Sequence, residues 1–486
     1  MRILMLGWEF PPFVSGGLGT ACFGLTRALD RMGHQVTFVL PRGVDRAIQT
    51  HVKLLGPQAV AAPSNPLAIQ AQRAAMEIAG LREPVPTTGA GAIATGASAA
   101  DLTGLGLSNT RLVGVPAAFS SPYPGGRKVG TPRRVTITGP DGMPIEVDTD
   151  EMDESHATHG NATFAAHGAG AGPGYRGDLV AESERYARLV VALCRNEEFD
   201  VVHAHDWLTF PAGQALSRVT GKPLVVHVHS TEFDRAGEHP NQRVYDIERR
   251  GMMAAMRVVA VSELTQSLCI RRYGVPTSKI DVVYNGVDND HQPPAGAGIR
   301  GKDKVVLFLG RITMQKGPEY FIAAARRVLE KVPDAKFIMA GSGDMELRMI
   351  ELAAHYGIGH RVLFTGFLRG ADVDRIFRMA DCYVMPSVSE PFGIAPLEAM
   401  RNDVPVIVSR TSGVSEVVQH VLKVDFWDID EMANKIVAVL RHPPLGQTMR
   451  EHGSFEVRKL TWDTSAEGVL RAYDKATAGQ RELLGV

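Results

Sequence analysis

The stretch Ser387–Met400, SVSEPFGIAPLEAM, decides the fold prediction. A short apolar run, Asp381–Met385, enters it and predicts a buried strand. Leu397 and Met400, three residues apart, predict one face of a helix that leaves it. A short turn rich in Ser, Pro and Gly joins the two. Because ligands bind outside the carboxyl ends of the strands in an open parallel sheet, this turn is a candidate binding loop.

Two glutamates in this stretch, Glu390 and Glu398, have seven residues between them. Glu390 stands at the strand end, where a carboxylate can accept hydrogen bonds from sugar hydroxyls. Glu398 lies further into the helix and could hold another pair of hydroxyls, such as those of a ribose. The helix start offers free N–H groups and the positive end of the dipole to a phosphate, and Gly393 permits close approach. A plain strand–turn–helix with a capping glutamate explains the same pattern without a ligand.

The pattern E-P-F-G-x-x-x-L-E-A-M, from Glu390 to Met400, resembles the E-x7-E motif of retaining glycosyltransferases with the GT-B architecture. The branch it resembles contains glycogen and starch synthases, sucrose synthases and bacterial group 1 glycosyltransferases. This resemblance implies an α/β fold in which two Rossmann-like domains with parallel sheets face each other across a cleft. It also implies a hexosyltransferase that uses a nucleotide sugar.

The length, charge and cysteine content of the chain limit the number of domains, the classes of partner and the kinds of metal or disulfide site. A chain of 486 residues corresponds to two or three domains at roughly 150 residues each. The formal net charge of -1 gives no global basic field, which argues against nucleic acid or an anionic membrane as a partner. The cysteines are far apart and form no CxxC pair, which argues against a zinc knuckle or a disulfide framework and fits a reducing cytoplasm. They are Cys22, Cys194, Cys269 and Cys382.

The N-terminal residues MRILMLGW predict a strand rather than a signal peptide. No apolar run approaches the ~20 residues of a membrane span. We therefore expect a cytoplasmic protein without an integral membrane segment.

The chain opens with a predicted strand, Arg2–Leu6, a loop rich in glycine, Gly7–Gly19, and a helix that ends near Met32. Val36–Leu40 is the second strand. A strand–loop–helix–strand opening with glycines at the helix start is the form of a phosphate cradle. A dinucleotide dehydrogenase begins in the same way, but it ordinarily places an acidic residue after its second strand. Val39–Arg42 contains no acid and the loop is longer than G-x-G-x-x-G, so NAD binding is the weaker interpretation.

From about residue 45 to 177 the composition shifts toward Gly, Ala and Thr. We predict a large, partly disordered insertion in the first domain. Within it, 58–80 could form a helix, and Arg133–Val147 alternates like a hairpin with a turn at 140–142. Three histidines of the insertion could bind metal, although a solvated loop explains them better. They are His156, His159 and His167.

Strands alternate with helices on both sides of a Pro/Gly-rich linker at 289–301, which predicts parallel sheets in both halves. The further predicted strands are 199–203, 223–227, 258–261 and 281–284 before the linker, and 304–309, 336–340, 362–365 and 404–408 after it. We predict an acceptor-side domain over 1–288 and a nucleotide-sugar domain over 302–462. A helix within 463–486 is predicted to pack back toward the first domain.

Two cations follow the first strand of the second domain. Arg311 and Lys316 belong to Gly310–Gly317, GRITMQKG, and are expected at the same sheet edge as Glu390. Two fixed cations beside a helix start can neutralise a diphosphate without a metal ion. Two solvated basic residues in a loop are the plain alternative.

The G-R-x4-K-G pattern resembles the donor-phosphate arginine and lysine of the glycosyltransferase family. The same resemblance implies that Phe367 stacks on the nucleotide base. It also implies that the N–H groups of Gly393 and Ile394 contact phosphate or sugar.

In the first domain, H-A-H-D-W at His203–Trp207 resembles the same motif of glycogen and starch synthases. His205 matches their active-site histidine, which contacts the transferred sugar, and Gly16 and Gly17 match their donor-side glycine pair. Those synthases usually have a lysine two residues before that pair, where this chain has Val14. One donor-phosphate or acceptor contact is therefore missing or supplied elsewhere. Glu398 is more typical of the group 1 enzymes than of bacterial glycogen synthases.

The paired H-x-H motifs suggest a metal site, and with it an alternative function. Strand alternation puts His203 and His205 on one face, and likewise His227 and His229, so neighbouring strands could bring them to a zinc or iron ion. A metal-dependent hydrolase is thus the alternative from a different class. It leaves the second-domain cations and Glu390 unexplained. A non-catalytic carbohydrate-binding module is a weaker alternative, because such a module binds no phosphate and the predicted phosphate-binding loops would have no function in it.

We therefore predict a retaining hexosyltransferase that transfers glucose from ADP- or UDP-glucose to the end of a glucan. A group 1 enzyme with another sugar or polysaccharide acceptor is the alternative. Arg311, Lys316 and the helix beginning near Gly393 would stabilise the departing nucleoside diphosphate, so no metal cofactor is expected. His205 and Glu390 would position the sugar and its developing positive charge.

Overall fold

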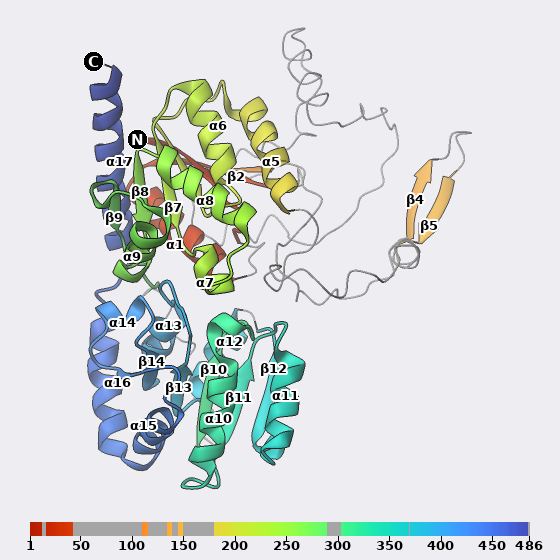
Figure 1. Cartoon of the computed structure of the whole chain (residues 1–486), viewed down its shortest axis with the longest axis vertical. Coiled ribbons are helices and arrows are strands. Elements are labelled where there is room, and N and C mark those ends of the chain that lie inside the picture. Colours follow the sequence, from red (N-terminus) through yellow and green to blue (C-terminus); the bar gives the residue numbers. More distant parts are fainter. Residues whose placement is uncertain are drawn as a thin grey trace. The chain divides into compact units, whose positions relative to one another are not determined.

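A computed structural model describes residues 1–11, 16–41, 109–114, 134–138, 144–148, 179–288, 303–368 and 370–484. The chain divides into two compact units, Met1–Pro124 with Gly172–Val486, and Gly125–Ala171. The larger unit contains two parallel sheets covered by helices, which we call the first lobe and the second lobe (Figure 1). The smaller unit contains an antiparallel hairpin of β4 (Arg134–Thr138) and β5 (Pro144–Asp148), as the alternation predicts.

The sheet of the first lobe has seven parallel strands in the order β3-β2-β1-β6-β7-β8-β9. They are β1 (Arg2–Leu6), β2 (Gln35–Leu40), β3 (Thr110–Gly114), β6 (Val201–His205), β7 (Leu224–Val228), β8 (Arg257–Ala260) and β9 (Ile280–Val282). β6 and β7 are buried along their whole length, as expected for strands with both faces covered. The strand order reverses between β1 and β6, which makes this the topological switch point of the sheet.

Helices cover both faces of this sheet. They are α1 (Gly17–Arg31), α5 (Leu179–Cys194), α6 (Phe210–Thr220), α7 (Glu232–Ala236), α8 (Gln242–Ala254), α9 (Glu263–Tyr273) and α17 (Trp462–Leu484). Because side chains alternate along a strand, Leu4 and Leu6 join the core with α5, α6 and α8, whereas Ile3 and Met5 join the core with α1 and α17.

The sheet of the second lobe has six parallel strands in the order β12-β11-β10-β13-β14-β15. They are β10 (Val305–Leu309), β11 (Lys336–Ala340), β12 (Val362–Gly366), β13 (Cys382–Met385), β14 (Val406–Ser409) and β15 (Leu422–Val424). Its helices are α10 (Pro318–Leu329), α11 (Glu346–His355), α12 (Ala371–Met379), α13 (Ala395–Arg401), α14 (Val414–Val417), α15 (Ile429–Arg441) and α16 (Pro443–Val457). The strand order reverses between β10 and β13. The prediction of parallel sheets in both halves is confirmed.

The last helix, α17, belongs to the first lobe although it follows the second lobe in sequence (Figure 1, dark blue). Its first residue, Trp462, fills the space that Gly24 of α1 leaves open, because a Cβ on Gly24 would lie 2.1 Å from the indole ring. Val469 and Tyr473 continue the buried face of α17 into the core. The C-terminal helix therefore completes one face of the first sheet.

The expected strands are all present, with ends shifted by at most two residues. The prediction for 199–203 is wrong at its ends, because the strand runs over Val201–His205. The sequence analysis missed β3, β15 and α16. Several predictions lie outside the described residues. They concern the helix at 58–80, the hairpin turn, the linker at 289–301, and His156, His159 and His167.

The missed strand β3 lies inside the predicted insertion, so the interval 45–177 is not insertion throughout. Asp30, buried at the end of α1, holds the start of β3. Its Oδ2 accepts hydrogen bonds from the Asn109 N–H at 2.6 Å and the Thr110 hydroxyl at 2.7 Å. A carboxylate thus ties β3 to a helix nearly eighty residues earlier in the chain.

Asp30→Ala is expected to lower the free energy of unfolding by about 2 kcal/mol, because it leaves the buried Thr110 hydroxyl and the Asn109 N–H without an acceptor. The urea midpoint measures this loss. Asp463→Ala is the matched control, since its carboxylate is 51% exposed and pairs with Arg31 at the surface. We expect less than about 1 kcal/mol there. Equal losses in both variants would contradict the role of Asp30.

Candidate active site

Most of the sequence-predicted site residues follow the carboxyl ends of the strands beside the switch points of the two sheets, whereas Phe367 follows the edge strand β12 and Glu398 lies in α13. His205 ends β6 in the first lobe. In the second lobe, the loop 310–317 follows β10 and the loop 386–394 follows β13, and β10 pairs with β13. This is where ligands bind in open α/β sheets.

Lys316 and Glu390 meet at this edge of the second sheet. The Lys316 ammonium donates to Oε2 of Glu390, whose side chain is only 8% exposed. The Ser387 hydroxyl lies 3.3 Å from the same oxygen. The Glu390 backbone is fixed by bonds to the Thr411 carbonyl and from the Gly413 N–H. The structure therefore places a buried carboxylate and a lysine in direct contact, at the sheet edge where the sequence predicts both.

The short 3-10 helix Met314–Lys316 positions this lysine. Gly317 ends it in the left-handed region, at φ +62°, and a Cβ there would lie 2.2 Å from the Pro386 carbonyl. Gln315 links the two loops, because its carbonyl accepts from Val388 N–H at 2.9 Å and its side chain accepts from Arg311 at 3.1 Å. Arg311 is thereby held on the loop that contacts the glutamate loop.

The start of α13 differs from the prediction. The helix begins at Ala395 rather than near Gly393, and Pro396 contributes no N–H. Gly393 adopts φ +100°, and a Cβ there would lie 3.1 Å from Cγ of Glu390. Within the described chain, the N–H groups of Gly393 and Ile394 donate to no backbone carbonyl. These two N–H groups remain as donors beside Glu390.

Glu398 and Phe367 lie further from the lysine–glutamate pair. Glu398 stands in the first turn of α13, where burial raises the pKa of its carboxyl, the charge of Asp374 raises it further and Arg401 opposes the shift. Phe367 follows β12 and is 45% exposed, so part of its ring faces solvent. Among the described contacts, Glu398 makes no ion pair with Lys316.

In the first lobe, His205 is fully buried and its Nδ1 lies 2.9 Å from Nε2 of His229. Asp206 makes this contact possible. Its backbone lies in the left-handed region at φ 56°, and its Oδ1 accepts from the N–H groups of His229 and Ser230. Burial raises the pKa of Asp206 to about 7, and the charge of Arg235 and the two backbone N–H groups oppose that rise.

The glycine pair also has a defined place. Gly16 caps α1 and Gly17 is its first residue. A Cβ on Gly16 would lie 3.7 Å from the carboxylate of Glu9, which is buried after β1. Residues 12–15 of the loop, including Val14, lie outside the described residues.

The histidines form a buried cluster. One nitrogen from each of His203, His205 and His227 lies within 4.8 Å of the others, a spacing that a metal ion could exploit. Hydrogen bonds also connect the cluster. Nδ1 of His203 lies 2.5 Å from the Tyr473 hydroxyl, and its Nε2 lies 3.2 Å from Nδ1 of His227. Burial, the largest cause, lowers the pKa of all four imidazoles, which keeps them neutral near pH 7.

The two lobes meet at the loops of the candidate site. The Ser389 hydroxyl donates to Asp234 of α7 at 2.5 Å, and the Ser262 hydroxyl donates to the Pro391 carbonyl at 2.5 Å. Glu416 accepts from the first two N–H groups of α9 at 2.9 and 2.8 Å, which caps a helix of the opposite lobe. The sequence analysis missed these contacts, because no local pattern marks a partner more than a hundred residues away.

Three family models together match most of the chain. They are glycosyl transferases group 1 over residues 292–454, glycosyltransferase family 4 over 156–291, and the starch synthase catalytic domain over 2–79. An uncharacterized glycosyltransferase of Methanocaldococcus jannaschii is 31% identical over 296 residues, which are 57% of this chain and 75% of that protein. The chain belongs to the group 1 glycosyltransferases.

This group 1 glycosyltransferase also resembles glycogen synthase of Mycobacterium tuberculosis strain H37Rv, at 27% identity over 294 residues, or 58% of this chain and 70% of the other. Among solved structures, sucrose-phosphate synthase from Thermosynechococcus elongatus matches with a TM-score of 0.64 at 18% identity, covering 98% of this chain and 99% of that one. The predicted GT-B fold is therefore confirmed.

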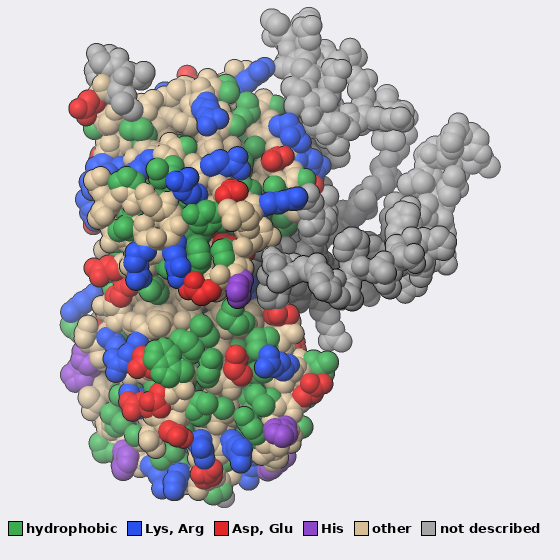
Figure 2. Space-filling view, viewed as in Figure 1, with side chains coloured by type: hydrophobic (Ala, Val, Ile, Leu, Met, Phe, Trp, Pro, Cys, Tyr) green, Lys and Arg blue, Asp and Glu red, His purple; other side chains and the backbone are tan. Residues whose placement is uncertain are grey.

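Three further observations concern regions of the glycosyltransferase outside the candidate site. A cavity of about 740 Å³ lies at the amino ends of β10, β11 and β12, at the edge opposite the Lys316–Glu390 pair, and has no part in the candidate site. Figure 2 shows basic and acidic side chains interspersed over the visible face. Among the described residues, no helix has the length and apolar character needed to cross a bilayer.

Proposed function

We propose that this glycosyltransferase transfers glucose, with retention of configuration, from ADP- or UDP-glucose to the end of a glucan. The observation that carries the proposal is the contact of Lys316 with the buried Glu390 at the switch point of the second sheet. A fixed cation and a fixed carboxylate side by side suit a donor whose phosphates are anionic and whose sugar ring becomes cationic as the bond breaks.

The leaving group needs neutralisation as negative charge develops on the nucleoside diphosphate. Lys316 and Arg311 supply positive charge from the loop after β10, and the N–H groups of Gly393 and Ile394 supply donors from the loop after β13. Charge-assisted hydrogen bonds of this kind are about twice as strong as neutral ones. These groups replace the metal ion that many other phosphate sites require.

The sugar is positioned by groups from both lobes. Glu390 accepts hydrogen bonds from sugar hydroxyls and faces the developing positive charge, while Glu398 holds the ribose hydroxyls. Phe367 stacks on the base and the Gly16–Gly17 pair approaches the donor. His205 contacts the transferred sugar, since its Nε2 is buried without a described hydrogen-bond partner. The acceptor hydroxyl attacks from the face of departure, so no protein nucleophile is required.

A glucan is the proposed acceptor because the starch synthase match covers the start of the chain and because W-E-F-P-P and H-A-H-D-W favour glycogen synthases. Another sugar acceptor is the alternative. The experiment is a screen of nucleotide sugars for thermal stabilisation, followed by product analysis with maltooligosaccharides. Elongated maltooligosaccharides with an α-linkage support the proposal, and donor hydrolysis without elongation would redirect it to another acceptor.

Chelation separates the transferase from the hydrolase alternative. We expect EDTA to leave the rate of sugar transfer unchanged, because protein cations and N–H groups stabilise the diphosphate. The rate is measured after dialysis against EDTA, with dialysis against buffer as the control. Loss of activity that zinc restores would favour a metal ion held by His203, His205 and His227.

A further inference from the structure

The short helix α7 lies against three parts of the candidate site. It follows the loop after β7, which carries His229, the hydrogen-bond partner of His205. It also contacts the 3-10 helix Met314–Lys316 of the second lobe, and its Asp234 reaches the loop that carries Glu390. A single turn of helix thus stands where groups from both lobes have to be brought together around one donor sugar.

The carboxylate of Asp234 is buried and uses both of its oxygens. Oδ2 accepts from the N–H of Thr231 at 2.7 Å and from its hydroxyl at 2.8 Å, which caps α7. Oδ1 accepts from the Ser389 hydroxyl of the second lobe at 2.5 Å. Burial raises the pKa of Asp234, and the hydrogen bond from Ser389 is the largest of the causes that oppose this rise. The charged carboxylate is therefore stabilised by the opposite lobe as well as by its own helix cap.

Both ends of this hydrogen bond are closely attached to site residues. In the first lobe, Thr231 lies two residues after His229, whose own N–H is held by the residue after β6. In the second lobe, Ser389 directly precedes Glu390 in the chain. The bond between the lobes therefore sets the spacing between the loop after β7 and the loop after β13.

The two neighbours of Glu390 in the chain are both bonded to the first lobe. Ser389 donates to Asp234, and the Pro391 carbonyl accepts from the Ser262 hydroxyl at 2.5 Å. Within the described chain, the hydrogen bonds of Glu390 itself stay in the second lobe. Those bonds orient the carboxylate in its own lobe, whereas the flanking bonds fix its position relative to the first lobe.

We propose that Asp234 is a positioning residue of the candidate active site: it holds Ser389 across the lobes and thereby fixes the Glu390 carboxylate relative to His205. The proposal rests on the proposed function in placing His205 and Glu390 at the same sugar. Because the cations that face the diphosphate belong to the second lobe alone, breaking this bond slows sugar transfer more than it weakens nucleotide binding.

The first test separates rate from affinity. Ser389→Ala removes the bond between the lobes and leaves Asp234 as the cap of α7. We expect kcat for release of the nucleoside diphosphate to fall about tenfold, as for a lost hydrogen bond to a charged group. The Kd of ADP or UDP, measured by titration calorimetry, is expected to change by about twofold or less. A loss of affinity as large as the loss of kcat would place Ser389 in the phosphate loop and overturn the proposal.

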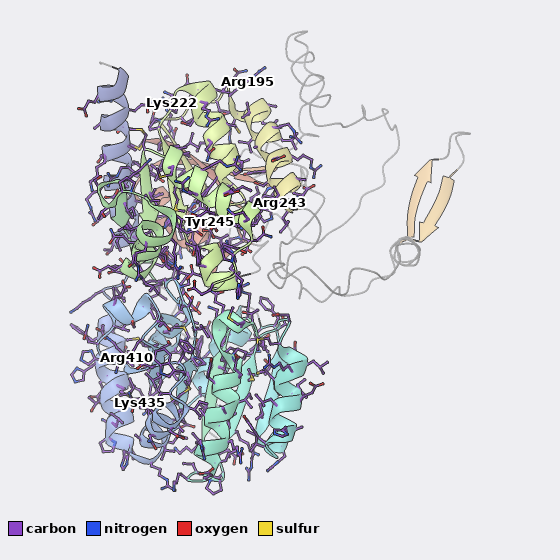
Figure 3. All side chains as sticks on the ribbon, in the orientation of Figure 1. Arg195, Lys222, Arg243, Tyr245, Arg410 and Lys435 are labelled. Atoms are coloured by element: carbon purple, nitrogen blue, oxygen red, sulfur yellow. The ribbon has the colours of Figure 1, made fainter. Side chains whose placement is uncertain are left out.

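The matched control is Ser217→Ala. Ser217 is also half-buried, and its hydroxyl donates at 2.6 Å to the carbonyl of Lys222, which lies in the first lobe away from the candidate site (Figure 3). We expect kcat to stay within about twofold of the natural value there. Equal losses of kcat in Ser389→Ala and Ser217→Ala would show a merely structural role.

A double-mutant cycle and a conservative variant test whether the two residues act through one bond. Asp234→Asn leaves one acceptor oxygen for the Thr231 cap. Combined with Ser389→Ala, it is expected to lower kcat no further than the more damaging single substitution, because the second change finds the bond already broken. Ser389→Thr keeps the hydroxyl and is expected to retain most of kcat. Independent, multiplying losses, or a threonine variant as slow as the alanine variant, would contradict the proposal.

A last test needs no substrate and so stays informative if the sugar transferred is not glucose. The four natural cysteines are buried, so spin labels attach selectively to cysteines introduced at the exposed Arg243 of α8 and Arg348 of α11. Double electron–electron resonance then measures the separation of the lobes. Ser389→Ala is expected to broaden the distance distribution, whereas Ser217→Ala leaves it unchanged. An unchanged distribution in Ser389→Ala overturns the proposal, while failure of glucosyl transfer in the natural protein overturns only the proposed function.

Discussion

Lys316→Ala is expected to lower kcat/KM for the nucleotide sugar by about 10²–10³, the effect of removing one preorganised group that stabilises developing negative charge. The lysine is fixed by Glu390 at the carboxyl edge of β10, so its ammonium does not have to be ordered when the donor binds. Steady-state kinetics with varied donor concentration measure the loss.

The control for this variant is Lys435→Ala. Lys435 lies on α15 in the second lobe (Figure 3) and pairs with Glu431, and its side chain is as exposed as that of Lys316, at 21%. A comparable loss in both variants, or near-normal turnover in Lys316→Ala, would defeat the phosphate assignment. Arg311→Ala is expected to behave like Lys316→Ala, and Arg410→Ala, on the loop after β14, serves as its control.

Glu390→Gln is expected to lower kcat by about 10² or more while the protein remains folded, because the substitution keeps the shape and removes the charge. The neutral amide no longer faces the cationic sugar, and Lys316 loses the partner that orients it. The measurement combines kcat with the thermal midpoint of the variant.

Glu456→Gln is the control, because it shows how much kcat changes when a largely buried glutamate outside the candidate site loses its charge. Glu456 is also largely buried, at 15% side-chain exposure, and accepts from the N–H groups of Gln419 and His420. It lies on α16, outside the candidate site. If kcat for Glu390→Gln stays near that of the natural protein, Glu390 does not stabilise the sugar in the transition state.

The fold could be predicted largely from local patterns. Continuous apolar runs such as that of β10, VVLFL, mark strands with both faces covered. The alternation of such strands with helices restricts the chain to a small number of sheet topologies. Glycines at helix starts mark the loops at the switch points. The same patterns predicted that Lys316 and Glu390 lie at the same sheet edge, because both residues follow strands that neighbour each other in a Rossmann-like order. Their direct contact is seen only in the structure.

What the sequence could not predict depends on partners distant in the chain. The short strand β3 has no strong pattern of its own and is fixed by Asp30. The contact of Tyr473 with His203 joins residues 270 positions apart. Asp206 lies within the H-A-H-D-W motif, but its left-handed backbone and its hydrogen bonds to the loop after β7 are visible only in three dimensions.

The placement of α17 on the first lobe has a consequence for how the protein is made. Domains usually fold from the N-terminus onward as they leave the ribosome. Here the apolar face around Leu25, Val225 and Val259 stays uncovered until Trp462 and Val469 have been synthesised. A chain whose translation stops before residue 462 therefore leaves this apolar face of the first lobe exposed. We expect such a truncated product to bind chaperones and to aggregate.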